Sequence, residues 1–366
     1  MVVPTVSICL PVYNGEQFLA QAIESVLRQT FTDFELLIAD DCSEDASWEI
    51  AEEYAGQDAR IVAWKNEANK GLFGNYNETL RRSSGKYIKP FAQDDLFAPE
   101  ILERMLAGLR AYPAATLVAC ARKIVDGEGR ERKTACEYDD TVLLEGPAKV
   151  KEDLLKVSNG IGEPSTVMFP SSLIGDGFDT TLYHLGDIDY WHRLILGGKL
   201  LYLSDTLVSF RRHGGSTTNR NARGLRYALD MFRLARKYRD FLLSQGVSEE
   251  GYAEICMENI VSHMKFLVQQ EGVTLKQLLA ERNGAGAGSD NELDSFKELA
   301  YRGLLMAGES KEEIVALKSE WEEERNRLED RIASLIRSRS WKLTVPLRAT
   351  AKAVHAARRK KGEKRR

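Results

Sequence analysis

The chain has 366 residues, of which 43% are hydrophobic and 29% charged, and its net charge is −4. This length is enough for one α/β domain with an appendage, and the composition is that of a globular protein. No apolar run approaches the ~20 residues of a membrane-spanning helix, and the start has no basic segment before an apolar stretch, so we expect no secretory signal. The five cysteines are scattered without a CxxC pair, which argues against a disulfide framework and a structural zinc site. We therefore expect a cytoplasmic protein.

Short apolar runs alternate with helical patterns in the first part of the chain. We predict strands at residues 6–10, 34–39, 61–64 and 86–91, and helices at 18–27, 48–54, 76–82 and from Pro99 onward. This alternation predicts an α/β fold with a mostly parallel sheet and helices on both faces. Ligands of such sheets bind at the carboxyl ends of the strands. Two acidic pairs, Asp40-Asp41 and Asp94-Asp95, follow predicted strands and are therefore candidate site residues.

The pattern changes after about residue 115. We predict strands at 116–125, 166–169 and 200–203, a hairpin turn at 126–129, and helices at about 187–196, 220–243 and 251–270. Residues 283–292, rich in Gly and Ala, are a candidate linker. Residues 311–336 have spaced apolar positions among charged ones, so a weak coiled coil that allows self-association is one alternative.

The last 30 residues are strongly basic. Residues 337–366 contain 12 Lys or Arg and one acidic residue, a local charge of +11 that leaves −15 on the rest of the chain. Apolar residues interspersed with basic ones suit the interface of an anionic bilayer, whereas a basic end can also be disordered. Nucleic acid is not an expected partner, because the body is acidic and shows no nucleic-acid-binding motif.

Each candidate motif has a chemical and a structural interpretation. Asp94 and Asp95 suit a hard divalent cation such as Mg²⁺ or Mn²⁺ that neutralises a diphosphate, or they form a solvated turn that caps a helix. Asp41 is suited to accept a ring N–H of a pyrimidine base, or it caps a helix. Tyr13, in a turn that begins at Pro11, lies flat against a base or packs on the sheet edge. The Gly-rich segments match neither a P-loop nor a GxGxxG motif, so we predict neither ATP nor NAD binding.

The motifs together resemble family 2 of the nucleotide-sugar glycosyltransferases. The resemblance rests on VSICLPVYNGEQFLAQAIESVLRQTFTDFELLIADDCSED and NKGLFGNYNETLRRSSGKYIKPFAQDD, and it covers about residues 5–215. It implies a Rossmann-like fold with a DxD-type metal motif and inverting sugar transfer. One departure is Gln93, which stands where this family often has Asp.

The resemblance also implies residue roles. On the nucleotide-sugar side it points to Pro11, Tyr13, Asp41, Lys70 and Asp94. Asp41 would accept from the base, Pro11 and Tyr13 would form the base pocket, and Asp94 would reach the ribose or the metal. Asp95 would ligate Mn²⁺ or Mg²⁺ directly, with His213 as a further ligand.

The catalytic base implied by the resemblance is Asp187, which opens the predicted helix at 187–196. Asp189 lies on roughly the opposite side of that helix, so the two do not serve together. A helix-capping role for Asp187 is the structural alternative. The resemblance also implies that Glu163, Pro164 and Ser165 line the acceptor side.

We predict a catalytic domain at 1–218, a helical extension at 219–282, the linker at 283–292, helices at 293–340 and a basic tail at 341–366. The expected reaction moves a hexosyl or deoxyhexosyl group from a UDP- or dTDP-sugar to a hydroxyl of a glycan or lipid-linked glycan, in the synthesis of a cell-surface polysaccharide. Peripheral contact with the inner face of the membrane through the tail is part of this expectation. The alternatives are a nucleotidyltransferase on a related sheet and a non-catalytic assembly protein.

Overall fold

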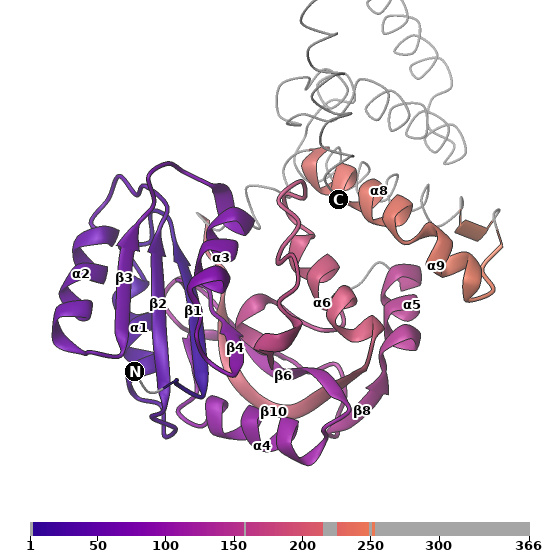
Figure 1. Ribbon diagram of the computed structural model, residues 1–366, viewed down its shortest axis with the longest axis horizontal. Helices are drawn as coiled ribbons and strands as arrows, with labels where there is room; N and C mark the ends of the chain where they lie inside the picture. Colours follow the sequence, from indigo (N-terminus) through magenta and orange to yellow (C-terminus); the bar gives the residue numbers. More distant parts are fainter. Residues whose placement is uncertain (1–2, 157–158, 215–224, 249–250, 253–366) are drawn as a thin grey trace, which may run out of the picture. The chain divides into compact units, whose positions relative to one another are not determined.

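The computed structural model describes residues 3–156, 159–214, 225–248 and 251–252 (Figure 1). Its ten-stranded sheet has the strand order β3-β2-β1-β4-β9-β6-β10-β5, with β7 beside β6 and β8 beside β10. The strands are β1 Val6–Val12, β2 Phe34–Asp40, β3 Ile61–Lys65, β4 Tyr87–Pro90, β5 Leu96–Phe97, β6 Ala115–Val125, β7 Glu131–Ala135, β8 Val142–Glu145, β9 Val167–Pro170 and β10 Lys199–Arg211.

The sheet is mixed but mostly parallel, which confirms the predicted fold class. Strands β1 to β4 are parallel where they pair, and β6 and β10 are parallel to each other. Strand β9 joins these two groups and is antiparallel to both β4 and β6. Strands β5, β7 and β8 are antiparallel additions at the β6–β10 side.

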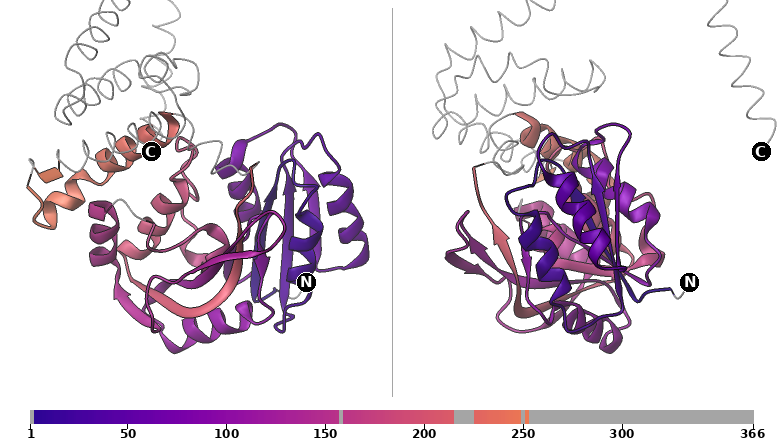
Figure 2. Two further views of the ribbon diagram at one scale, coloured as in Figure 1. Left: turned by 180° about the vertical axis from the view of Figure 1, so that it is seen from behind. Right: turned by 90° about the vertical axis from the view of Figure 1, so that its left-hand side faces the viewer.

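Helices cover both faces of the sheet (Figures 1 and 2). The helices are α1 Leu19–Leu27, α2 Ser47–Gln57, α3 Gly71–Arg82, α4 Ile101–Ala111, α5 Gly146–Lys156, α6 Gly186–Leu196, α8 Leu225–Lys237 and α9 Arg239–Ser244, with short 3₁₀ turns η1 Pro164–Thr166 and η2 Ser171–Leu173. Apolar residues of α1, α2 and α4 share one core cluster, and those of α3, α5, α6 and α8 share the other. The sheet separates the two clusters.

Strand β1 shows why the sequence folds in this way. All seven of its residues are buried, as expected of a central strand covered on both faces. Ile8 and Leu10 belong to the core cluster with α1, whereas Cys9 between them belongs to the cluster with α3. Helix α1 buries Leu19, Ile23 and Val26, the spacing of one helical face.

The register of the parallel strands brings the candidate motifs to one edge of the sheet. Val12 at the end of β1 pairs with Asp40 at the end of β2, and Cys9 pairs with Pro90 at the end of β4. The turn after β1, the Asp40-Asp41 pair and the Gln93–Asp95 segment therefore leave the sheet at the same edge.

Several predicted elements differ in length from the observed ones. The strand expected at 200–203 is part of the 13-residue β10, which continues past register shifts next to Leu203 and Thr206. Helix α3 begins at Gly71 rather than residue 76, because backbone N–H groups at its start are bound by Asp41. In the described part of the predicted helix at 220–243 the structure has two helices, α8 and α9, on either side of Tyr238. The predicted helix at 251–270 lies outside the described residues except for its first two. Helix α5 and strands β5, β7 and β8 were not predicted.

The predicted hairpin turn at 126–129 connects β6 to β7, which pair in antiparallel register. Gly129 adopts a φ of 80°, which favours glycine. The domain boundaries stay a prediction. The linker at 283–292, the helices at 293–340 and the tail at 341–366 lie outside the described residues.

Candidate active site

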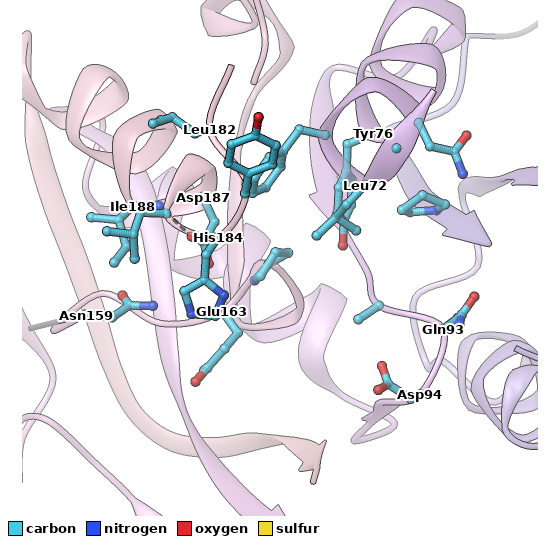
Figure 3. Close-up of a pocket in the computed structure, with 18 of the residues that line it drawn as sticks. Leu72, Tyr76, Gln93, Asp94, Asn159, Glu163, Leu182, His184, Asp187 and Ile188 are labelled. Carbon is cyan, nitrogen blue, oxygen red and sulfur yellow. Dashed lines mark hydrogen bonds between the residues drawn. The ribbon is translucent and has the colours of Figure 1, made fainter. Parts of the chain in front are cut away.

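A cavity of 1210 Å³ lies at the carboxyl edge of the sheet. Eight residues that the sequence pointed to all border it: Pro11, Tyr13, Asp41, Lys70, Asp94, Asp95, Asp187 and His213. These residues come from separate parts of the chain, and the fold brings them together. Figure 3 shows Gln93 and Asp94 on one side of the cavity, and Glu163, His184 and Asp187 on the other.

Asp41 binds the start of α3 and also borders the cavity, and its contact with a base stays a prediction. Its carboxylate accepts the backbone N–H groups of Lys70 (2.8 Å) and Gly71 (2.9 Å) at the start of α3, while it borders the cavity. The side-chain amide of Asn66 donates to it at 2.8 Å and also donates to Asn75 at 2.9 Å. Asp41 is only 2% exposed. The carboxylate is therefore held rigidly, and its aim toward the cavity is set by the start of α3.

The turn after β1 is fastened to the segment that carries the acidic pair. The side-chain oxygen of Gln93 accepts the N–H of Tyr13 at 2.8 Å, and its side-chain nitrogen donates to the Tyr13 carbonyl at 3.0 Å. Only an amide can do both, because a carboxylate has no N–H to donate. A Cβ on Gly15 would lie 2.6 Å from the Gln93 amide, so a larger residue there would displace this side chain from Tyr13. This pairing explains the glutamine that departs from the family pattern.

The adjacent carboxylates Asp94 and Asp95 have different surroundings. Asp94 is partly exposed, and its Oδ2 lies 3.0 Å from Nε2 of His213. Asp95 is fully buried, and its two oxygens accept the hydroxyl of Ser165 (2.5 Å) and the N–H of Arg211 (2.9 Å). Burial, followed by the neighbouring charge of Asp94, raises the pKa of Asp95 well above its usual value. Asp94 is thus the more accessible of the two carboxylates, and ligation of a metal by Asp95 stays a prediction.

A buried lysine is linked to Asp95 through Ser165. Lys89 of β4 is fully buried, and burial lowers its pKa to about 7. Its Nζ donates to the carbonyl of Ser165 and lies 4.3 Å from the centre of the Phe97 ring. The carbonyl and hydroxyl of Ser165 thus link Lys89 to Asp95.

Arg211, at the end of β10, is a structural link rather than a free phosphate ligand. Its guanidinium donates to the carbonyls of Asp94 (2.9 Å) and Gly127 (3.0 Å) and to the side chain of Gln21 (2.9 Å). It also lies 4.4 Å from the centre of the Phe18 ring. Arg211 is therefore occupied with ordering this wall of the cavity, whereas Arg212 is exposed and borders the cavity.

Asp187 is the second residue of α6. Its carboxylate accepts the N–H of Ile188 at 2.8 Å. Burial raises the pKa of Asp187 to about 7 against the effect of that hydrogen bond, with smaller contributions from the charges of Glu163 and Asp230. A carboxylate whose pKa lies near neutrality is well matched to taking a proton from a hydroxyl.

Asp189 has a different environment, as the helical spacing predicted. It is fully buried, and it accepts from Arg193 (2.9 Å) and pairs with Lys237 (2.8 Å). Glu163, on the same side of the cavity as Asp187, pairs with Arg122 at 2.5 Å.

With this geometry established, the chain can be compared with known proteins. The sequence model described as Glycosyl transferase family 2 matches residues 7–174. An uncharacterized protein of Mycobacterium tuberculosis is 30% identical over 243 residues, which are 63% of this chain and 74% of that protein. The chain belongs to glycosyl transferase family 2.

Further comparisons agree with this family. The putative colanic acid biosynthesis glycosyl transferase WcaA of Escherichia coli is 38% identical over 106 residues, 28% of this chain and 37% of that protein. The crystal structure of S. aureus TarS 1-349 in complex with UDP-GlcNAc matches with a TM-score of 0.59 and 19% identity, and the match covers 82% of each chain. At this identity the TarS likeness shows the fold.

Several residues of this glycosyltransferase site escaped the sequence analysis. Asn66 donates to Asp41 and to Asn75, and nothing local in the sequence marks either asparagine. Ser165, which was expected on the acceptor side, instead donates to Asp95. Lys70 borders the cavity, but its amino group pairs with Glu78.

Among the described residues of the glycosyltransferase, no helix has the length and apolar character to cross a membrane. The same part of the chain has no group of three or more His, Cys, Asp or Glu side chains placed to hold a metal ion.

Proposed function

We propose that this glycosyltransferase moves a hexosyl or deoxyhexosyl group, with inversion, from a UDP- or dTDP-sugar to a hydroxyl of a glycan or lipid-linked glycan acceptor. The observation that carries the proposal is that one cavity is bordered by three kinds of carboxylate. They are Asp41, which is suited to bind a nucleobase, the pair Asp94-Asp95, and Asp187, whose pKa burial raises to about 7. The similarity to WcaA, a putative colanic acid biosynthesis enzyme, supports a role in surface-polysaccharide synthesis. The UDP-GlcNAc bound in the TarS complex supports a UDP-sugar donor.

The nucleotide side of the proposed site lies between the β1 turn and α3. Tyr13 is 37% exposed and borders the cavity, so its ring is available to a base. Three donors already bind Asp41 through four contacts, two to each carboxylate oxygen. In this proposal the ring N–H of uracil or thymine shares this acceptor-only carboxylate.

The residues around Asp94 fit a divalent cation if substrate phosphates complete its coordination. Asp94 and His213 bring a carboxylate oxygen and an imidazole nitrogen within 3.0 Å of each other. Cations of this kind are commonly held by one or two protein ligands together with phosphate oxygens. The nitrogen ligand favours Mn²⁺ over Mg²⁺. When bound, the ion would neutralise charge that develops on the leaving diphosphate.

Asp187 is proposed as the base on the acceptor side. As the acceptor hydroxyl attacks the anomeric carbon, its proton passes to the Asp187 carboxylate. The bond from that carbon to the phosphate oxygen breaks on the opposite face, and the nucleoside diphosphate leaves. Positioning of the two substrates in one cavity contributes further to the rate.

Product analysis tests this function against the alternatives. The protein is incubated with UDP- and dTDP-sugars, Mn²⁺ and glycan acceptors, and in parallel with nucleoside triphosphates and sugar phosphates. We expect nucleoside diphosphate release that depends on the acceptor. Release of pyrophosphate from a triphosphate would instead identify a nucleotidyltransferase. If the protein turned over no donor and the Asp187→Asn variant kept full function in cells, it would be an assembly protein.

A further inference from the structure

Helix α8 places a buried carboxylate on the turn that leads into α6. Asp230 is fully buried. Its Oδ2 accepts the backbone N–H groups of Tyr183 (2.8 Å), His184 (2.6 Å) and Leu185 (3.1 Å). These are consecutive donors immediately before the helix in which Asp187 is the second residue. A single side-chain oxygen from a distant helix thus fixes the direction in which α6 begins.

Helix α6 has no capping side chain of its own. Its N-cap residue is Leu185, which makes no side-chain cap hydrogen bond. Negative charge near a helix N-terminus is favourable, and Asp230 supplies it from α8. The usual local signal for a helix start is therefore replaced by a tertiary contact.

The rest of α8 reinforces this contact. One turn and two turns after Asp230, Arg233 donates to the Thr181 carbonyl and Lys237 pairs with Asp189 at 2.8 Å. The hydroxyl of Tyr238, just after α8, lies 3.1 Å from the Asp189 carboxylate. Hydrogen bonds and ion pairs therefore join α8 to the segment that runs from residue 181 into α6. Both helices lie outside residues 7–174, where the family model matches.

The charge on Asp230 is costly for the fold alone. Its Oδ1 is buried and has no hydrogen-bond partner in the described part of the chain. Burial raises the pKa of Asp230, opposed by its three backbone hydrogen bonds. A buried acceptor without a partner costs stability, and such a group in a native protein calls for an explanation.

We propose that Asp230 is a positioning residue, which sets the place of Asp187 in the cavity through the main chain of residues 183–185 and makes α8 part of the active site. This inference rests on the proposed role of Asp187 as the base. Four ionisable groups from other elements interact electrostatically with Asp187: Glu163 before η1, Tyr76 of α3, and Tyr227 and Asp230 of α8. Among them, Glu163 and Asp230 carry the negative charge that favours protonation of Asp187.

Two substitutions separate position from charge. Asp230→Asn removes the charge, so it shifts the acidic limb of the kcat/KM profile to lower pH, and it weakens the hold on three N–H groups. Asp230→Glu keeps the charge but extends the side chain by one methylene, so it lowers kcat and leaves the limb in place. Misplacement of a catalytic group by ~1 Å costs about 10²-fold in rate. We expect losses of this order in kcat, with the KM for the donor unchanged.

The experiment uses the full chain with a UDP- or dTDP-sugar donor and records rates across a pH series that spans neutrality. The matched control is Asp240→Asn on α9, whose side chain is 93% exposed, and it should leave kcat and the pH profile unchanged. An Asp230→Asn enzyme with wild-type kcat or an unshifted limb overturns the proposal. If that variant does not fold, Asp230→Glu decides, and wild-type kcat in folded Asp230→Glu overturns it.

Hydrogen exchange distinguishes failure of this inference from failure of the proposed function. The amides of residues 183–185 should exchange faster in Asp230→Asn, while those of α3 should not change. An unchanged rate at residues 183–185 overturns the positioning role whether or not the enzyme is active. If the wild-type protein releases no nucleoside diphosphate from any donor, the proposed function fails, and faster exchange would still establish Asp230 as the residue that holds the start of α6.

Discussion

Asp94 and Asp95 show how two adjacent, identical residues acquire different roles. Both carboxylates border the cavity, but they stand at a turn and have different partners. Asp94 meets His213, whereas Asp95 accepts hydrogen bonds from Ser165 and Arg211. We therefore propose Asp94, the more accessible of the two, as a metal ligand and Asp95 as a residue that holds the loop.

A matched pair of substitutions tests this difference. Asp94→Ala should remove Mn²⁺-dependent transfer and leave thermal stability unchanged, because only a partly exposed carboxylate is lost. Asp95→Ala should lower the free energy of unfolding by about 1–3 kcal/mol, because it leaves the Ser165 hydroxyl and the Arg211 N–H buried without a partner. The measurements are a Mn²⁺ titration of activity and chemical denaturation. A stable, inactive Asp95→Ala beside an active Asp94→Ala would reverse the assignment.

Asp187 carries a prediction of its own. Asp187→Asn should lower kcat by about 10²–10⁴-fold, the usual contribution of a general base, while nucleoside diphosphate still binds at the Asp41 end. Titration calorimetry and initial rates measure the two effects. Asp176→Asn, which alters an exposed aspartate in the same region, is the control. Retained turnover in Asp187→Asn would remove the base assignment.

The pH dependence of the wild-type enzyme follows from the same residue. A base acts in its ionised form, and burial raises the pKa of Asp187 to about 7. We therefore expect kcat/KM to rise with pH through about 7 and then level off, and to fall tenfold per pH unit well below it. If kcat/KM stayed constant down to the ordinary pKa range of aspartate, the raised pKa of Asp187 would be wrong.

At the scale of elements, the site depends on contacts between loops that follow different strands. The amide of Gln93 fastens the turn after β1 to the loop after β4, and Arg211 fastens the end of β10 to the same loop and to α1. Because these loops converge at one edge of the sheet, a few side-chain bonds align the nucleotide end with the acidic pair.

Gln93→Glu tests the first of these links. The new carboxylate would face the Tyr13 carbonyl and stand beside Asp94, so it would lose one hydrogen bond and repel both groups. We expect the Kd for UDP or dTDP to rise about tenfold, which corresponds to about 1.4 kcal/mol. Gln57→Glu at the end of α2, distant from the cavity lining, is the matched control. Unchanged nucleotide affinity in Gln93→Glu would show that the turn holds its shape without this pairing.

At the scale of the whole molecule, a mostly parallel sheet places one large cavity where its strands end, and α8 closes onto that cavity from beyond the region matched by the family model. A ligand that binds only the folded state stabilises it by mass action, by about 2.7 kcal/mol at a concentration of 100 Kd. The predicted self-association through residues 311–336 and the membrane contact of the tail lie outside the described residues and stay predictions.

Thermal unfolding with a panel of nucleoside diphosphates is therefore informative about the donor. We expect UDP or dTDP with Mn²⁺ to raise Tm more than the same nucleotide alone, and more than ADP or GDP. Asp94→Ala should abolish the part of the shift that depends on Mn²⁺. A larger shift with a purine nucleotide would contradict the proposed contact between Asp41 and a pyrimidine ring.

The sequence by itself determined the family, the mostly parallel sheet and the place of Asp41, Asp94 and Asp187 beside one cavity. Strand and helix periodicity is local, and parallel strands end at a common edge, so motifs that follow strands converge. Only the tertiary structure decided the different partners of Asp94 and Asp95, what Arg211 binds and which backbone groups Asp230 holds. These depend on side-chain direction at irregular turns and on partners more than 40 residues apart, such as Asp230 and Leu185 at a separation of 45. No local pattern of residues encodes such contacts.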